Sequence, residues 1–144
     1  MSPHDAGYSG TPLPRKLGIR AGDRVAVIAA PEGFAAVLGG LEDGVRMHHR
    51  LRGRFDVIVV FATRRAALDR RLIGLRDALE PAGGLWLAWP KRVSGMVTDL
   101  SDAEVRAIGL ATGLVDNKVC AIDETWSALR FVYRRAERPG AAST

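Results

Sequence analysis

The stretch 55–89, FDVIVVFATRRAALDRRLIGLRDALEPAGGLWLAW, contains two apolar runs on either side of an arginine-rich segment. The runs 55–62 (FDVIVVFA) and 85–89 (LWLAW) are typical of strands that are buried on both faces. Between them, leucines recur at intervals that place them on one face of a helix: Leu68, Leu72, Leu75 and Leu79. The stretch therefore predicts a strand, a helix capped by Thr63 and ended by PAGG at 81–84, and a second strand.

The preceding sequence continues this alternation of strands and helices. Residues 24–30 (RVAVIAA) form another short apolar run, and a helix is predicted from Pro31 to Leu38, where a pair of glycines ends it. Residues 45–51 alternate between apolar and basic side chains. This pattern predicts a half-exposed strand, and its arginines suit the edge of a sheet.

The sequence after residue 89 predicts a loop, a helix and a hairpin. Residues 90–100 lack periodicity, and a capping box, SDAE, at 101–104 begins a helix that ends at Gly113. Residues 115–122 and 126–135 are predicted strands, and their short connection makes them an antiparallel hairpin. The pattern as a whole predicts an α/β fold of three layers, in which a mainly parallel, twisted sheet ends in this C-terminal hairpin.

Length and composition predict one domain. The chain has 144 residues, of which 47% are hydrophobic and 26% charged, as in single globular domains. We expect this domain at 15–137, between an irregular arm at 1–14 and a flexible tail at 138–144. The single cysteine excludes an internal disulfide framework. No apolar run reaches the roughly 20 residues of a membrane span and no secretory signal is visible, so we expect a cytoplasmic protein without membrane contact.

The order of elements, which closes with a helix and an antiparallel hairpin, resembles the C-terminal half of class I methyltransferases. LGIRAGDRVAVIAAPEGF at 17–34 is similar to their first strand and glycine turn, in degraded form. More closely, the chain resembles a small bacterial family described only as a domain of unknown function, through YSGTPLPRKLGI at 8–19, LWLAWPKRVSGMVTDL at 85–100 and KVCAIDETWSALRFV at 118–132. These resemblances imply a truncated, methyltransferase-like Rossmann fold, with the last strand inserted beside the strand that ends at Trp89. They imply no particular activity.

The turn after the first strand argues against a site for S-adenosylmethionine or a dinucleotide. Such sites need backbone N–H groups from a glycine turn, and a carboxylate after the second strand for the ribose hydroxyls. Here Pro31 removes one N–H donor, Glu32 adds negative charge, and LRG at 51–53 offers no carboxylate. We therefore predict that the chain binds neither cofactor.

The ends of the predicted strands bring polar side chains to one rim of the sheet, where open α/β folds bind ligands. The candidate ligand-binding residues at this rim are Glu32, Lys91, Arg92, Ser94, Asp99, Asp123 and Trp126. In a ligand site, Lys91, Arg92 and Ser94 would hold an anion, and Trp126 would supply a flat wall. The alternative is structural: Lys91 and Asp123 form an ion pair that closes the loop, with Trp126 packed as a lid.

The histidines and the cysteine show no spacing that is typical of a metal or catalytic site. His48 and His49 are adjacent, so their side chains point to opposite faces of a strand. The alternation places His49 on the apolar face and His48 toward solvent. Cys120 is predicted to be a buried, inert thiol in the middle of a strand. We predict no metal site, and the sequence singles out no catalytic residue.

Arginine supplies most of the positive charge, and the net charge of +5 is unevenly distributed. The segment 46–76 contains nine arginines and two aspartates. The candidate polyanion-binding residues in it are Arg46, Arg50, Arg52, Arg54, Arg64 and Arg65. The arginine-bearing side lacks interleaved aromatic residues for base stacking, so nucleic-acid binding there would be phosphate-led and salt-sensitive. The alternative is a solvated, arginine-rich surface without a partner.

Three functions stay open at this point. The leading prediction is a small domain that binds a partner protein or a small anionic ligand at the rim of the sheet. The second, which the sparse motifs favour less, is an enzyme that acts on an anionic substrate through Lys91, Asp99 and Asp123. The third is phosphate-led nucleic-acid binding through the arginine-rich segment 46–76.

Overall fold

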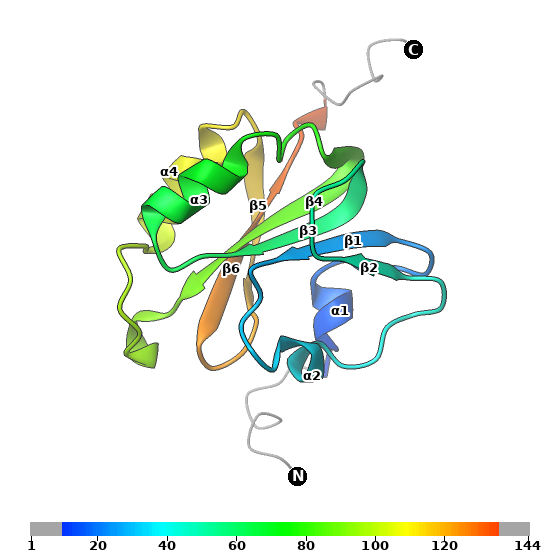
Figure 1. Cartoon of the computed structure of the whole chain (residues 1–144), viewed down its shortest axis with the longest axis horizontal. Coiled ribbons are helices and arrows are strands. Elements are labelled where there is room, and N and C mark those ends of the chain that lie inside the picture. The colour runs from blue at the N-terminus through cyan, green and yellow to red at the C-terminus, as the bar shows by residue number, and fades with distance from the viewer. Residues whose placement is uncertain (1–9, 136–144) are drawn as a thin grey trace.

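The computed structural model describes residues 10–135 as one sheet with helices on both faces (Figure 1). The strands are β1 (Arg24–Ile28), β2 (Arg46–His48), β3 (Phe55–Phe61), β4 (Leu79–Pro90), β5 (Val115–Ala121) and β6 (Trp126–Val132). The helices are α1 (Leu13–Lys16), α2 (Phe34–Leu38), α3 (Arg65–Leu72) and α4 (Asp102–Leu110), with a short 3-10 helix at Arg92–Ser94. The predicted tail at 138–144 and residues 1–9 of the predicted arm lie outside the described residues, and α1 begins within the arm at Leu13.

The strand order is β2-β1-β3-β4-β6-β5. The first four strands in this order are parallel neighbours, whereas β6 is antiparallel to both β4 and β5. The predicted parallel sheet with a C-terminal antiparallel hairpin is therefore confirmed, and so is the insertion of the last strand beside β4. As a consequence, the β5–β6 turn reaches the same rim as the ends of β1, β3 and β4.

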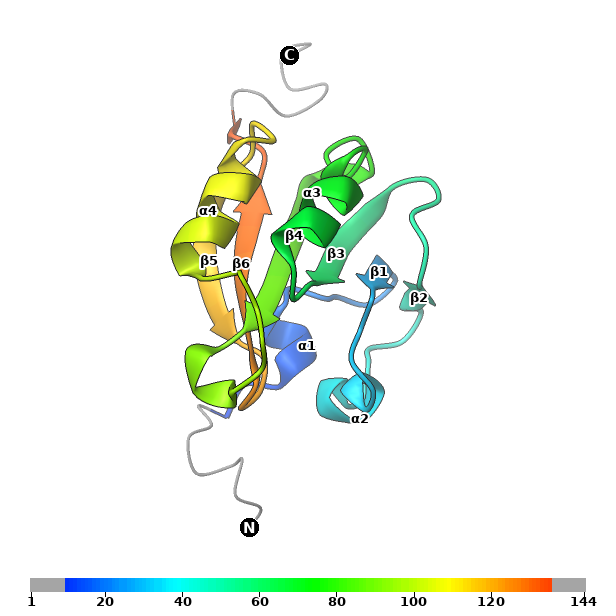
Figure 2. The same ribbon diagram turned by 60° about the vertical axis from the view of Figure 1, so that its left-hand side comes forward.

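The helices create two apolar cores, one on each face of the sheet (Figure 2). On one face α3 and α4 pack through residues such as Leu68 and Val105. On the other face α1 and α2 pack through residues such as Phe34, around the fully buried Trp86 of β4. The Trp86 indole Nε1 donates to the carbonyl of Leu17 at 3.0 Å, which ties the loop after α1 to the middle of the sheet.

The helices are shorter than the sequence pattern predicts. α2 begins at Phe34 rather than Pro31, because the Phe34 N–H donates to the Pro31 carbonyl at 3.2 Å in a preceding turn. α3 ends at Leu72, since Gly74 turns the chain with a φ of 84° shortly afterwards. No helix in the described part of the chain is long and apolar enough to cross a membrane.

The PAGG stretch at 81–84 belongs to β4 and does not end a helix, which corrects the sequence prediction. Leu79, predicted as the last helical leucine, begins this strand and pairs with Phe55 of β3. It is still fully buried, so the leucine spacing correctly identified a core residue in the wrong element. Gly83 is required for close approach, because a Cβ there would lie 2.6 Å from the carbonyl oxygen of Asp56.

Candidate functional site

Three of the predicted rim residues lie together where β4 ends and the β5–β6 hairpin turns. The Lys91 Nζ donates to the main-chain carbonyl of Asp123 at 2.7 Å, and the Lys91 N–H donates to the Thr125 carbonyl at 2.7 Å. Trp126 follows immediately and begins β6. Lys91 therefore ties the end of β4 to the hairpin turn.

The Asp123 carboxylate shapes the turn instead of forming the predicted ion pair with Lys91. Its Oδ1 accepts from the N–H groups of Thr125 and Trp126, both at 2.8 Å, in an Asx-type turn. The Trp126 side chain is buried and packs edge-on against Phe61, with ring centroids 5.1 Å apart. The indole is thus part of the core on the α1 face and does not line an open surface.

The remaining candidates in the loop after β4 are also engaged by the fold. The Ser94 Oγ donates to the Lys91 carbonyl at 2.7 Å. The Asp99 Oδ1 accepts from the Arg65 N–H at 2.7 Å and so caps the beginning of α3. The Arg92 side chain is exposed and makes no hydrogen bond or ion pair with the described residues. The loop therefore offers one free charged group, Arg92, rather than a prepared anion site.

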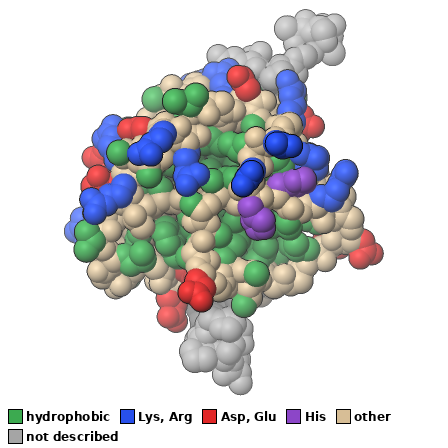
Figure 3. Space-filling view, in the orientation of Figure 1, with side chains coloured by type: hydrophobic (Ala, Val, Ile, Leu, Met, Phe, Trp, Pro, Cys, Tyr) green, Lys and Arg blue, Asp and Glu red, His purple; other side chains and the backbone are tan. Residues whose placement is uncertain are grey.

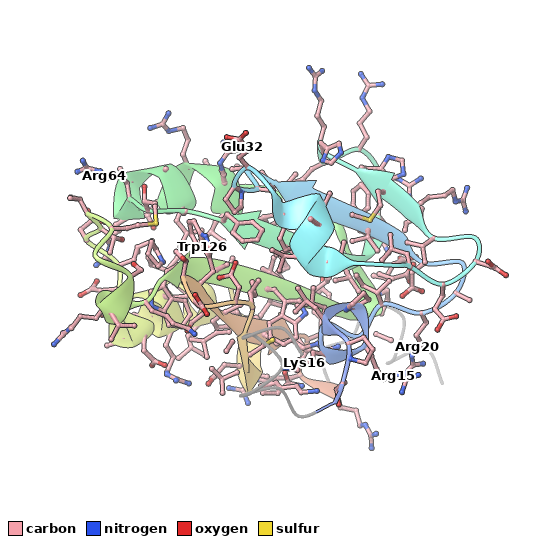
Figure 4. All side chains as sticks on the ribbon, turned by 90° about the horizontal axis from the view of Figure 1, so that it is seen from below. Arg15, Lys16, Arg20, Glu32, Arg64 and Trp126 are labelled. Atoms are coloured by element: carbon pink, nitrogen blue, oxygen red, sulfur yellow. The ribbon has the colours of Figure 1, made fainter. Side chains whose placement is uncertain are left out.

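The turn after β1 is open to solvent at the same rim. Ala29, Ala30 and Glu32 are exposed, and Figure 4 shows the Glu32 side chain at the surface. Ala29 has a φ of 58°, a left-handed conformation that costs a non-glycine residue about 1–2 kcal/mol. Residues 49–54, which follow β2, contain no carboxylate. The two segments that argue against a cofactor site, the acidic turn after β1 and the carboxylate-free residues after β2, therefore both lie at the rim.

The two histidines have the opposite orientation to the one predicted. The His48 ring packs against Phe55 with centroids 5.4 Å apart, and its Nε2 is buried with no hydrogen-bond partner. His49 is exposed. The prediction is wrong because β2 comprises only Arg46–His48, so the strand alternation does not extend to His49.

Cys120 is buried in the core on the α1 face, as predicted. Burial raises the pKa of its thiol above the ordinary value, and the nearby charges of Lys16, Lys118 and Lys91 counteract part of this rise. The described residues contain no group of three or more His, Cys, Asp or Glu residues that could hold a metal ion.

The six arginines that were predicted to bind polyanions have different surroundings. Arg54 and Arg65 form ion pairs with Glu80 and Glu104, respectively. The other four are exposed and form no ion pair with the described residues: Arg46, Arg50, Arg52 and Arg64. Arg64 lies at the beginning of α3 (Figure 4). The predicted set therefore divides into two arginines with ion pairs and four exposed arginines without one among the described residues.

A pocket of about 520 Å³ lies on the α1 face, away from the predicted rim residues. The charged side chains that line it come from α1, two loops and the terminal hairpin: Arg15, Lys16, Arg20, Glu42, Lys118 and Arg130. Five of these side chains are cationic and one is acidic, and we call this cavity the basic pocket. Figure 4 shows Arg15, Lys16 and Arg20 gathered near α1, apart from Glu32 and Arg64.

Arg130 is the least exposed cation without a partner in the basic pocket. It pairs across the sheet with Trp86 and Lys118, which directs its side chain to the α1 face. The residue is half-buried, and its side chain forms no ion pair or hydrogen bond with the described residues. Burial lowers the pKa of Arg130 from its ordinary value, and the positive charge of Arg20 adds to this effect. A Cβ on Gly84 would collide with the Arg130 guanidinium, so this glycine allows the side chain to lie against β4.

The sequence analysis missed the basic pocket because its cations come from four separate segments. One signal was nevertheless readable from the predicted hairpin. Folding 115–122 onto 126–135 about its turn places Lys118 opposite Arg130, and this register is observed. Like charges directly opposite each other destabilise a strand pair, so such a pair indicates a role other than folding.

Comparison with solved structures supports the fold. Magnesium protoporphyrin IX methyltransferase from Synechocystis PCC 6803, with bound SAH, aligns with a TM-score of 0.58 at 11% identity, over 84% of this chain and 78% of that chain. A SAM-dependent methyltransferase from Aquifex aeolicus aligns with a TM-score of 0.57 at 15% identity, over 81% of this chain and 85% of that chain. The ribosomal protein L11 methylase from Lactobacillus delbrueckii subsp. bulgaricus aligns with a TM-score of 0.56 at 12% identity, over 85% and 75%.

At these identities the similarity shows the fold alone: the chain has a methyltransferase-like Rossmann fold. No protein-family model matches the sequence, and the search of curated proteins finds no match. The resemblance to a family of unknown function therefore stays a prediction.

Proposed function

We propose that this methyltransferase-like domain binds a small phosphate-bearing ligand in the basic pocket. The observation that carries the proposal is Arg130, a half-buried guanidinium without a carboxylate partner among the described residues. A buried charge is costly unless it is paired, and a ligand phosphate would supply the missing partner. The pocket volume of about 520 Å³ also falls in the range typical of small-molecule sites.

The composition of the basic pocket favours phosphate over a single carboxylate. Four cations besides Lys16 and one carboxylate line it, so a ligand with two or more negative charges balances them better than a single carboxylate does. Three of the cations are arginines, whose forked N–H donors match the oxygens of a phosphate group. A diphosphate or a phosphate ester with a second anionic group fits this balance best.

We propose further that the rim does not bind S-adenosylmethionine, although SAH is bound in the Synechocystis neighbour. The support is the acidic, proline-containing turn at Pro31 and Glu32 and the lack of a carboxylate at 49–54. The lining of the basic pocket contains no serine, cysteine or histidine, and its one carboxylate, Glu42, is exposed to solvent. We therefore propose binding rather than catalysis, and the cytoplasmic location stays a prediction from the sequence.

The test is isothermal titration of the full chain with inorganic pyrophosphate, adenosine 5′-diphosphate and S-adenosylmethionine, each at low salt. We expect binding of both phosphate compounds that weakens as salt is added, because the contacts are ionic. No binding of S-adenosylmethionine is expected up to millimolar concentration. A micromolar dissociation constant for S-adenosylmethionine, or no heat with either phosphate compound, would overturn the proposal. Binding of inorganic pyrophosphate without binding of adenosine 5′-diphosphate would restrict the ligand to a free inorganic anion.

Arg130→Met removes the central cation and keeps a side chain of similar length. We expect it to weaken pyrophosphate binding at least tenfold, as expected for loss of a charge-assisted contact. Thermal unfolding of this variant should shift upward, since a half-buried charge without a carboxylate partner among the described residues is removed. Arg135→Met, which removes an exposed cation outside the pocket, is the matched control. Equal affinity of the Arg130 variant and the control would place the ligand elsewhere.

A further inference from the structure

A second cavity, of about 320 Å³, lies on the opposite face of the sheet from the basic pocket. Its floor is apolar and includes Ile28 and Val60, which belong to the core under α3 and α4. Its walls are the second half of α3 and the residues that follow β2, including His49. We call this cavity the α3 groove.

Three arginines line the α3 groove: Arg50 on one wall, and Arg70 and Arg71 on the other. All three side chains are exposed and make no ion pair or hydrogen bond with the described residues. The nearest acidic residue of α3, Asp69, lies 3.9 Å from Arg65 and is thus already paired. The residues that line the groove include no carboxylate, so its charge is entirely positive.

The space-filling view shows how these charges are distributed. In Figure 3, Lys and Arg side chains gather over α3 and across toward β2, with histidine side chains and hydrophobic surface among them. At the edge of the groove, Ile73 is 83% exposed in the turn that follows α3. The groove therefore combines cationic walls with an apolar floor and an apolar edge.

We infer that the α3 groove binds single-stranded nucleic acid, with phosphates on the arginines and bases or sugars on the apolar floor and Ile73. The arginine fork suits phosphate oxygens, and unpaired bases present flat apolar faces. Arg46 of β2 and Arg52, which follows the groove residue Leu51, are also exposed. A run of acidic residues would satisfy the arginines, but without apolar side chains of its own it would leave the floor uncovered. The inference rests on residues separate from those of the basic pocket.

The binding should be weak, salt-dependent and indifferent to sequence. The groove residues include no Phe, Tyr or Trp side chain for stacking, and arginine contacts to phosphate carry no sequence information. Neutralising three phosphates of a single strand predicts that the logarithm of the association constant falls with the logarithm of salt concentration with a slope of about −2.

The experiment is fluorescence anisotropy of a labelled oligothymidylate with the full chain and two charge-reversal variants. Arg70→Glu combined with Arg71→Glu should weaken binding at least tenfold and flatten the salt slope. Arg134→Glu combined with Arg135→Glu reverses an adjacent pair of exposed arginines beyond β6 and is the matched control. We expect this control to change affinity by less than about threefold, because distant exposed charges are screened.

Four results would overturn the inference. Equal losses in the two double variants would mean a general charge effect. Stronger binding of a duplex of the same length would show that unpaired bases on the apolar floor play no part. Equally effective competition by polyglutamate would show that an acidic protein segment fits the groove as well. Loss of oligonucleotide binding in Arg130→Met, with no loss in the α3 variant, would place the strand in the basic pocket. The last result leaves the pyrophosphate titration as an independent test of the proposed function.

Discussion

The side chain of Arg130 is held against β4 with two other cations nearby, an arrangement that opposes folding. Lys118 lies directly opposite it on β5, and the charge of Arg20 further disfavours its protonated form. Gly84 lies in the middle of a strand, where glycine is unfavourable, and its lack of a side chain leaves space for the guanidinium. Each of these three features lowers the free energy of unfolding, so the arrangement is better explained by ligand binding than by folding.

Cys120 provides a prediction at the same scale. Because its folded-state pKa is raised, the thiol is held in its neutral, unreactive form at neutral pH. We expect iodoacetamide to label the native protein at about pH 8 at least a hundredfold more slowly than free cysteine, with full reactivity in denaturant. Labelling of the native chain at the rate of free cysteine would show that the core on the α1 face is open around β5.

The raised pKa of Cys120 also predicts the pH dependence of stability. The neutral thiol stabilises the fold fully below the unfolded-state pKa of about 8.5, and this contribution falls as pH rises through the higher folded-state pKa. Cys120→Ala should therefore lose less unfolding free energy than the wild type between about pH 8 and pH 10. Parallel pH profiles for the two proteins would contradict this account.

At the scale of elements, the β5–β6 hairpin depends on the side chain of Asp123 as a hydrogen-bond acceptor. Asp123→Ala leaves the N–H groups of Thr125 and Trp126 without their partner and should cost about 1–2 kcal/mol of unfolding free energy. Asp123→Asn keeps an acceptor oxygen and should cost less than about 0.5 kcal/mol. Chemical denaturation of the three proteins measures both differences.

The same hairpin predicts weak coupling between Lys91 and Asp123. The Lys91 ammonium donates to the main-chain carbonyl of Asp123, which remains in every Asp123 variant. In a double-mutant cycle with Lys91→Met and Asp123→Ala, we therefore expect a coupling free energy below about 0.5 kcal/mol. A coupling free energy of several kcal/mol would instead indicate the ion pair between Lys91 and Asp123 that the sequence predicts.

The elements with strong local signals could be predicted from the sequence. The apolar runs gave β1, β3 and β4, and the capping box gave α4, where the Ser101 side chain accepts from the Glu104 N–H. Other features depend on contacts between distant segments. The cap of α3 is Asp99 rather than Thr63, and it comes from a loop more than thirty residues away. No local pattern contains that contact.

The candidate site shows the same limit. Lys91, Asp123 and Trp126 were correctly brought together, because strand order alone places them at one rim. Their roles could not be predicted, because they depend on the detailed geometry of the hairpin turn. The Asp123 carboxylate accepts from two turn N–H groups, and the Lys91 ammonium donates to a main-chain carbonyl instead. The basic pocket could not be predicted, because its shape depends on where the loop after α1 lies. That loop is held to the sheet by the hydrogen bond between the Trp86 indole and the Leu17 carbonyl, a contact between distant segments.

On the scale of the whole molecule, cationic side chains line cavities on opposite faces of one sheet. The basic pocket lies on the α1 face and the α3 groove on the other, whereas the rim used by ligands in open α/β folds presents Glu32 and side chains that the loops engage. The central claim is therefore that a methyltransferase-like fold binds an anion away from its strand-end rim.

The most direct test is the chemical-shift change of backbone amides when the isotope-labelled chain is titrated with inorganic pyrophosphate. We expect the largest changes at Arg20, Lys118 and Arg130, and no change at Ala29 and Glu32. Changes confined to the turn after β1 and to the loop after β4 would contradict it, because they would return the anion to the rim.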